Sequence, residues 1–276
     1  MLAGGDPRFG MPAKKVMMSR NLDEIKAWLS PQFAKGALEV ALVGDLDIET
    51  AIAAAAQTVG ALPPRGQKPE LAHLKKVSFP AQPFAKDYTI TSAIPKGALY
   101  LFWPTTDGLD VQRKRRLSLL ADVVSDRLRV KVREEIGGTY SPWAVSDVSE
   151  TFPGYGYLVA NVDVDPAMAE KISDLVISVA DDLATNGVTE DELERARQPL
   201  LTEMQQSLRT NSYWLNGVLA CAQESPKSST GRAHAFSRCE SDYDRPNLGR
   251  SQKNILATPV PRARLSFRLS RKRGSR

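Results

Sequence analysis

Two kinds of hydrophobic spacing divide most of the chain into strands and helices. Compact or alternating apolar runs, typical of strands, occupy residues 37–43, 88–94, 98–103, 140–148 and 155–164. Apolar side chains recur at helical spacing over residues 109–135, 166–185 and 189–221. From residue 88 onward the order is strand, strand, helix, strand, strand, helix, helix. This order predicts an α+β fold, with a mixed or antiparallel sheet and helices packed on one face.

The residues before this pattern form a separate group of predicted elements. Asn21 and Glu24 have the spacing of a capping box and predict a short helix that ends near Pro31. Asp47 is placed to cap an alanine-rich helix over residues 48–59, which follows the predicted strand 37–43. The proline-rich stretch 62–69 then has the composition of a linker. We therefore expect a domain boundary there, with a linker at 63–72 and a domain at 73–225.

The charge of the chain is concentrated in its last fifty residues. Residues 226–276 contain 13 Lys/Arg and three acids, a net charge of +10. Residues 1–225 have a net charge of −5, which gives the chain its total of +5. This segment is rich in Ser and Arg and has no sustained apolar period, so we expect it to be a disordered basic tail. The high isoelectric point therefore does not indicate a folded nucleic-acid-binding face. A function as a nucleic-acid or membrane binder that acts through the tail is one hypothesis, but it is not the favoured one.

Several kinds of site are excluded by the residues available. The chain has two histidines, His73 and His234, which are 161 positions apart and cannot form the paired-histidine helix of a zinc peptidase. Its two cysteines, Cys221 and Cys239, are too few for a disulfide framework. No apolar run reaches the 18 to 20 residues of a membrane helix, and the first residues lack a signal-peptide layout. We expect a soluble chain without a metal site; its compartment, periplasm or cytoplasm, stays open.

One segment combines residues with a plausible joint chemistry. In Arg133-Glu134-Glu135-Ile136-Gly137-Gly138-Thr139-Tyr140, an arginine ends a predicted helix, a tyrosine begins a predicted strand and two glycines allow a sharp turn between them. Guanidinium and phenol groups can both donate to a peptide carbonyl or to the oxyanion of a tetrahedral intermediate. The structural alternative is that Arg133 pairs with a neighbouring acid and Tyr140 packs in the core. The residues alone leave both interpretations open.

This segment resembles the R-E-x-x-G-x-x-Y stretch in the second half of the pitrilysin/insulinase (M16) family of zinc peptidases. Two other segments are also similar to the family: Leu42–Asp47 with Val59–Pro63, and Gly187–Leu193, which is like its "G-x-T-x-x-E-L" helix start. The resemblance implies an M16 (LuxS/metallohydrolase-like) α+β domain, preceded by residues 1–62 as the C-terminal remnant of another α+β domain. It also implies that Arg133 and Tyr140 bind substrate and stabilise the oxyanion.

The same resemblance implies that this chain is not active by itself. It would be the substrate-holding, truncated C-terminal-type half of a metallopeptidase, and zinc would be bound by a partner half with an H-x-x-E-H motif. The expected partners are that half, as a separate subunit or as part of a longer polypeptide, and an extended peptide, with no nucleic acid and no membrane. The alternatives are a non-catalytic peptide-binding or scaffold subunit, or a decayed gene fragment. The change in charge after about Ser225 leads to the hypothesis that the tail is read in a shifted frame or comes from a degenerate gene end.

Overall fold

A computed structural model describes residues 1–91, 96–137, 141–219 and the backbone of 263–270. The chain divides into two compact units. Unit 1 contains Met1–Gly5, Lys76–Gln206 and the C-terminal residues from His234, and unit 2 contains Asp6–Lys75 and Ser207–Ala233. The division falls at Lys75/Lys76, a few residues beyond the expected linker. That residues 1–62 end a preceding domain stays a prediction.

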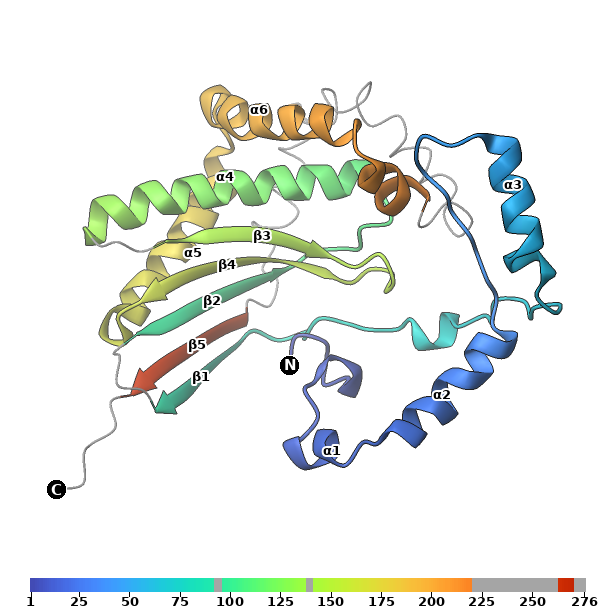
Figure 1. Cartoon of the computed structure of the whole chain (residues 1–276). Coiled ribbons are helices and arrows are strands. Elements are labelled where there is room, and N and C mark those ends of the chain that lie inside the picture. The colour runs from blue at the N-terminus through green and yellow to red at the C-terminus, as the bar shows by residue number, and fades with distance from the viewer. Residues whose placement is uncertain (92–95, 138–140, 220–262, 271–276) are drawn as a thin grey trace. The chain divides into compact units, whose positions relative to one another are not determined.

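Unit 1 is a five-stranded sheet with three long helices on one face (Figure 1). Its elements in chain order are β1 (Phe84–Thr91), β2 (Gly97–Pro104), α4 (Val111–Ile136), β3 (Trp143–Val148), β4 (Gly156–Val164), α5 (Ala169–Asn186), α6 (Glu190–Ser207) and β5 (Ala263–Ser270). The strand order is β1-β5-β2-β4-β3, with β1 and β5 parallel and the other neighbours antiparallel. The expected α+β fold, with a mixed sheet and helices on one face, is confirmed.

The core of unit 1 lies between this sheet and its helices. Because side chains alternate across a strand, β2 turns Leu99, Leu101 and Trp103 toward the helices, where each is almost fully buried. The matching residues of β4 and the apolar stripes of the helices complete the same cluster: Leu158, Ala160, Val162, Leu117, Leu120, Val124, Leu128, Ile172, Val176, Leu183 and Leu193. The periodicities read from the sequence therefore identify the layer interface.

Strand β5 differs from what the tail composition suggested. Residues 263–270 pair with β1 on one side and with β2 on the other, whereas the tail after residue 225 was expected to be disordered. The segment Ala-Arg-Leu-Ser-Phe-Arg-Leu-Ser alternates apolar and polar residues, which is the period of a strand, and the serine and arginine content obscured it. The remaining tail lies outside the described residues, so its expected disorder stays a prediction.

Unit 2 consists of helices and irregular segments. Its main elements are α1 (Lys14–Met18), α2 (Leu22–Lys35), α3 (Ile48–Gln57) and a π-helix at Tyr213–Val218. The capping box of Asn21 and Glu24 and the Asp47 cap both form as expected. Helix α2, however, continues through Pro31 to Lys35, and the helix expected over 189–221 is divided, because α6 ends at Ser207.

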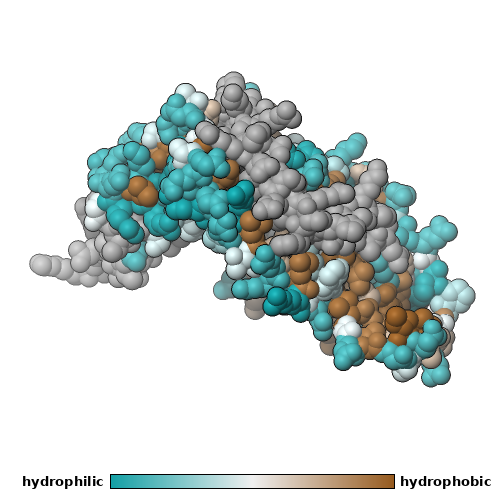
Figure 2. All heavy atoms as spheres, turned by 90° about the horizontal axis from the view of Figure 1, so that it is seen from above, coloured by the Kyte–Doolittle hydropathy of each residue, from teal (hydrophilic) through white to brown (hydrophobic). Residues whose placement is uncertain are grey.

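The expected strand 37–43 is also wrong: these residues have no regular structure, and about half of Leu38, Val40 and Leu42 is exposed. A strand requires a hydrogen-bonded neighbour, and the described residues of unit 2 include no strand. Other large apolar residues of this unit are exposed as well, including Trp28, Ile48 and Ile52. Hydrophobic surface around α2 and α3 is visible in Figure 2.

Two glycines near the β3–β4 connection, Gly154 in the turn and Gly156 at the start of β4, have different physical requirements. A Cβ added to Gly156 would lie 2.2 Å from the backbone oxygen of Thr106, whereas one added to Gly154, at φ +74°, would meet no atom within 4 Å. We expect Gly156→Ala to lower the free energy of unfolding by about 3 kcal/mol, because the backbone must move. Gly154→Ala should cost only about 1 kcal/mol, the cost of a left-handed conformation. Urea denaturation measures both, and equal losses would contradict this steric explanation.

Candidate functional site

Arg133 lies in the last turn of α4, where the helix ends at a left-handed glycine. Gly137 has φ 64° and donates its N–H to the Arg133 carbonyl, 3.1 Å away. The glycine is needed here because other residues adopt this conformation at a cost. The Arg133 side chain is exposed, and it makes no hydrogen bond or ion pair with any other described residue.

The other arginines of α4 differ from Arg133 in this respect. Arg113 pairs with Asp110, Arg129 pairs with Asp126, and Arg127 binds two carboxylates. The structural alternative for Arg133, an ion pair with a neighbouring acid, is therefore not seen among the described residues.

Tyr140, the second predicted site residue, lies outside the described residues. It falls between Gly137, where α4 ends, and Trp143, where β3 begins, so β3 is shorter than the expected strand 140–148. The approach of Tyr140 to Arg133 is therefore not tested and stays a prediction.

Beyond this segment, the face of the sheet opposite the helices carries aromatic side chains. Trp143 of β3, Asn161 of β4 and Tyr100 of β2 stand in one row across three strands. The rings of Trp143 and Tyr100 meet edge to face with their centroids 6.4 Å apart. In the neighbouring rows, Phe102 and Tyr157 make a similar contact at 5.4 Å. These strands were predicted from the sequence but their aromatic face was not; its signal is the alternation of Tyr100 and Phe102 within 98–103.

A tyrosine and a carboxylate form a hydrogen bond on the same face. The Tyr157 hydroxyl donates to Asp147 Oδ2 over 2.7 Å. Burial, this hydrogen bond and the negative charge of Asp147 all raise the pKa of Tyr157 well above its usual value of 10. Tyr157 therefore stays protonated at neutral pH and acts as a donor, not as a base.

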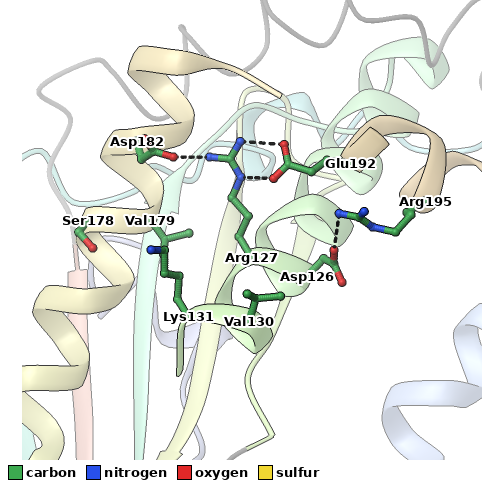
Figure 3. Close-up of a pocket in the computed structure, with 9 residues that line it drawn as sticks. All are labelled: Asp126, Arg127, Val130, Lys131, Ser178, Val179, Asp182, Glu192 and Arg195. Atoms are coloured by element: carbon green, nitrogen blue, oxygen red, sulfur yellow. Dashed lines mark hydrogen bonds and ion pairs between the residues drawn. The ribbon is translucent and has the colours of Figure 1, made fainter. Parts of the chain in front are cut away.

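On the helical side, a cavity of about 560 Å³ lies between α4, α5 and α6 (Figure 3). Arg127 at its centre donates to both carboxylate oxygens of Glu192, to Asp182 and to the backbone oxygen of Gly187. All its donor nitrogens are thus occupied by residues of the other two helices and the turn between them. This arrangement joins the three helices and uses four of the five N–H groups of Arg127.

A carboxylate outside this cavity has a perturbed titration. Burial, with the negative charge of Glu203 as the smaller cause, raises the pKa of Asp122 to about 6. Asp122 lies on α4 and Glu203 on α6.

Two carboxylates are too few to bind a metal tightly, and no group of three or more potential ligands occurs in the part of the chain that the structure describes. The described residues therefore do not fit a zinc ion. Nor is any described helix long and apolar enough to span a membrane.

Comparisons with known proteins agree on one family. The family described as "Peptidase M16 inactive domain" matches residues 20–200. Among curated proteins, the chloroplastic stromal processing peptidases of Arabidopsis thaliana and Oryza sativa subsp. japonica are 27% and 26% identical over 277 and 267 residues. These alignments cover 81% and 80% of this chain but 21% of each relative, so the chain spans about a fifth of their length.

Solved structures show the same fold. A peptidase M16 inactive domain from Pseudomonas fluorescens is similar with a TM-score of 0.75 at 22% identity, over 98% of this chain and 63% of that one. The ferredoxin protease FusC, solved as a mutant in complex with Arabidopsis ferredoxin, has a TM-score of 0.73 at 14% identity, over 98% of this chain and 29% of that one. Because the family match covers well over half of the sequence and includes Arg133, the chain belongs to the peptidase M16 family, as one of its inactive domains.

Proposed function

We propose that this chain is the substrate-holding, non-zinc half of an M16-type metallopeptidase, which hydrolyses peptides only together with a zinc-bearing half. The observation that carries the proposal is the exposed Arg133 guanidinium, which is unpaired among the described residues and lies at the end of α4 within the region matched by the inactive-domain family. Among the other described arginines of α4, Arg113 and Arg129 form ion pairs with acids on or next to the helix, whereas Arg133 forms none with the described residues.

In this proposal the chain contributes two hydrogen-bond donors. Arg133 would position the carbonyl of an extended substrate through its guanidinium N–H groups. Tyr140, seven residues later, would donate its phenolic hydrogen to the oxyanion that forms when water attacks that carbonyl. The zinc ion of the partner half would supply the activated water. The partner is either a separate subunit or another part of a longer polypeptide.

Peptide hydrolysis at fixed zinc concentration tests the proposal. The chain alone, a zinc-bearing H-x-x-E-H half from the same source alone, and an equimolar mixture of the two are assayed with the same fluorogenic peptides. We expect activity to rise at least about tenfold in the mixture, because the oxyanion donors are then complete.

A mixture that forms a complex, for example by size-exclusion chromatography, and yet shows no added hydrolysis would refute the catalytic part of the proposal. It would support the scaffold alternative instead. Bovine serum albumin at the same concentration replaces the chain in a control mixture, which accounts for non-specific protection of the zinc-bearing half.

A further inference from the structure

The open face of the sheet along β3 is a separate structural feature with no partner assigned to it. Helices α4, α5 and α6 cover the other face, and on this one Leu2, Phe79 and Phe84 pack against the central pair Phe102 and Val159. Nearer the edge, Trp143 is 40% exposed and Val145 is 45% exposed. The apolar surface therefore remains open on β3.

The two exposed residues, Trp143 and Val145, stand at the β3 ends of two successive rows whose inner members Asn161, Val159 and Phe102 are buried. In the first row Trp143 stands beside Asn161 and Tyr100, and in the next row Val145 stands beside Val159 and Phe102. Successive rows on one face are two residues apart, about 7 Å along the strand. The side chains of an extended peptide that point to one side have the same repeat, so two of them would match these two rows.

Carboxylates adjoin this apolar strip at both ends. Asp147 follows Val145 by two residues on the same face, and its carboxylate is exposed apart from the hydrogen bond from Tyr157. Asp163 is exposed on β4, one row beyond Asn161. A ligand that lies over this strip would therefore meet negative charge at its ends, which favours a basic side chain there and disfavours an acidic one.

One backbone group at the outer edge of β3 is already bound by a side chain of α4. The Ser125 hydroxyl of α4 accepts the Ala144 N–H at 2.7 Å and lies 3.0 Å from the Ala144 carbonyl oxygen. The outward N–H of Ala144 is thus already bound within the chain, and an added strand could not use it as a donor. The side chains of the open face offer a second mode of recognition at β3.

We propose that this face selects the substrate: it binds an extended peptide that has bulky apolar side chains at positions i and i+2, over Trp143 and Val145, and a basic side chain at i+4, near Asp147. The inference rests on the proposed function, since Trp143 follows Tyr140 by three residues in the sequence. The open face would thus determine which peptides are held at Arg133 and Tyr140.

Fluorescence anisotropy with the full chain measures this selection directly. The probe is a fluorescein-labelled peptide of serine and glycine that contains phenylalanine at i, leucine at i+2 and arginine at i+4. A second probe has the same composition but leucine at i+3, which turns that side chain to the opposite side of the extended peptide. We expect the first probe to bind more tightly, and Trp143→Ala to raise its Kd about tenfold, as for an aromatic residue at the centre of an interface.

Two protein controls accompany this experiment. Val130→Ser removes a valine of similar exposure, 46%, on α4 in the helical layer, and it should leave Kd unchanged. Asp147→Asn should remove most of the difference in Kd between the arginine probe and one with glutamate at i+4. If Trp143→Ala does not fold, judged by circular dichroism, the two probes of equal composition still decide with the unaltered chain.

Equal binding of both probes, or equal Kd values for the Trp143→Ala and Val130→Ser chains, would overturn the inference. So would a change in oligomeric state on Trp143→Ala without a change in peptide affinity, because the face would then be an interface between copies of the chain. These results are distinguishable from failure of the proposed function, which is judged by hydrolysis in the mixture. Added hydrolysis without probe selection would refute the selection surface alone, whereas probe selection without added hydrolysis would refute the catalytic role.

Discussion

Replacing Arg133 by alanine is expected to lower kcat/KM for peptide hydrolysis about 100-fold in the mixture of this chain with a zinc-bearing half, and Tyr140→Phe is expected to have a similar effect. The guanidinium is exposed and has no partner among the described residues, so its removal leaves no buried charge behind. Tyr140→Phe removes only one hydroxyl group. Losses of this size would therefore come from lost donors to the substrate, and kinetics at several substrate concentrations measure them.

The division of the loss between kcat and KM identifies the role of each residue. A donor that acts on the developing oxyanion lowers kcat, whereas one that only holds the substrate raises KM. We expect Tyr140→Phe to act mainly on kcat, and Arg133→Ala to act on both.

Arg129→Ala is the matched control for these variants. Arg129 lies one turn earlier on α4, is also exposed and pairs with Asp126. Its replacement should change kcat/KM by less than about twofold, since exposed ion pairs contribute little. If Arg129→Ala and Arg133→Ala had equal effects, general positive charge near the end of α4 would explain the result, and the specific role of Arg133 would be refuted.

The fold of unit 1 could be predicted because its strands and helices have clear hydrophobic periods. Leu99, Leu101 and Trp103 alternate in β2, and these positions are the ones that pack against the helices. Segment 37–43 and strand β5 show the limit of this reasoning. The first is apolar but has no neighbouring strand in the described part of unit 2, and the second is paired on both sides although arginine and serine dominate its surroundings. Strand formation depends on partners distant in the sequence, and local composition does not contain that information.

The candidate site was predictable only in part for a similar reason. The motif around Arg133 is contiguous, so the sequence indicated it directly. Trp143, Asn161 and Tyr100 come from three strands, and their row exists only once the register of those strands is known.

The capping box at the start of α6 shows the same contrast between local and distant contacts. Thr189 and Glu192 have its spacing, and the structure confirms both of its hydrogen bonds. Glu192 also binds Arg127, which lies 65 positions away. No local pattern indicates that second contact, because it depends on how α4 and α6 pack together.

Arg127→Met is expected to lower the free energy of unfolding by about 3 kcal/mol, because it removes one partner of a largely buried ion pair. The Arg127 and Glu192 side chains are only 14% and 15% exposed, whereas Asp182 is 54% exposed and can return to water. The main cost is therefore the unpaired Glu192 carboxylate. The double variant with Glu192→Gln should recover part of the loss, since it removes the charge that Arg127 neutralised. Urea denaturation at pH 7 measures both variants, with Arg129→Met as an exposed control that should cost less than about 1 kcal/mol.

The pH dependence of this difference tests its electrostatic cause. Burial alone would raise the pKa of Glu192, but hydrogen bonds from Arg127 and Thr189 outweigh it and lower the pKa from 4.5 to about 2. A lowered folded-state pKa contributes stability that is complete above the unfolded value near 4.5 and is lost as the pH falls toward 2. The contribution is on the order of 3 kcal/mol. The free energies of unfolding of the unaltered chain and of Arg127→Met should therefore differ most above about pH 5 and converge as the pH falls from 4.5 to about 2. Curves that stay parallel over this range would mean that Arg127 stabilises the helices by packing and not by its charge.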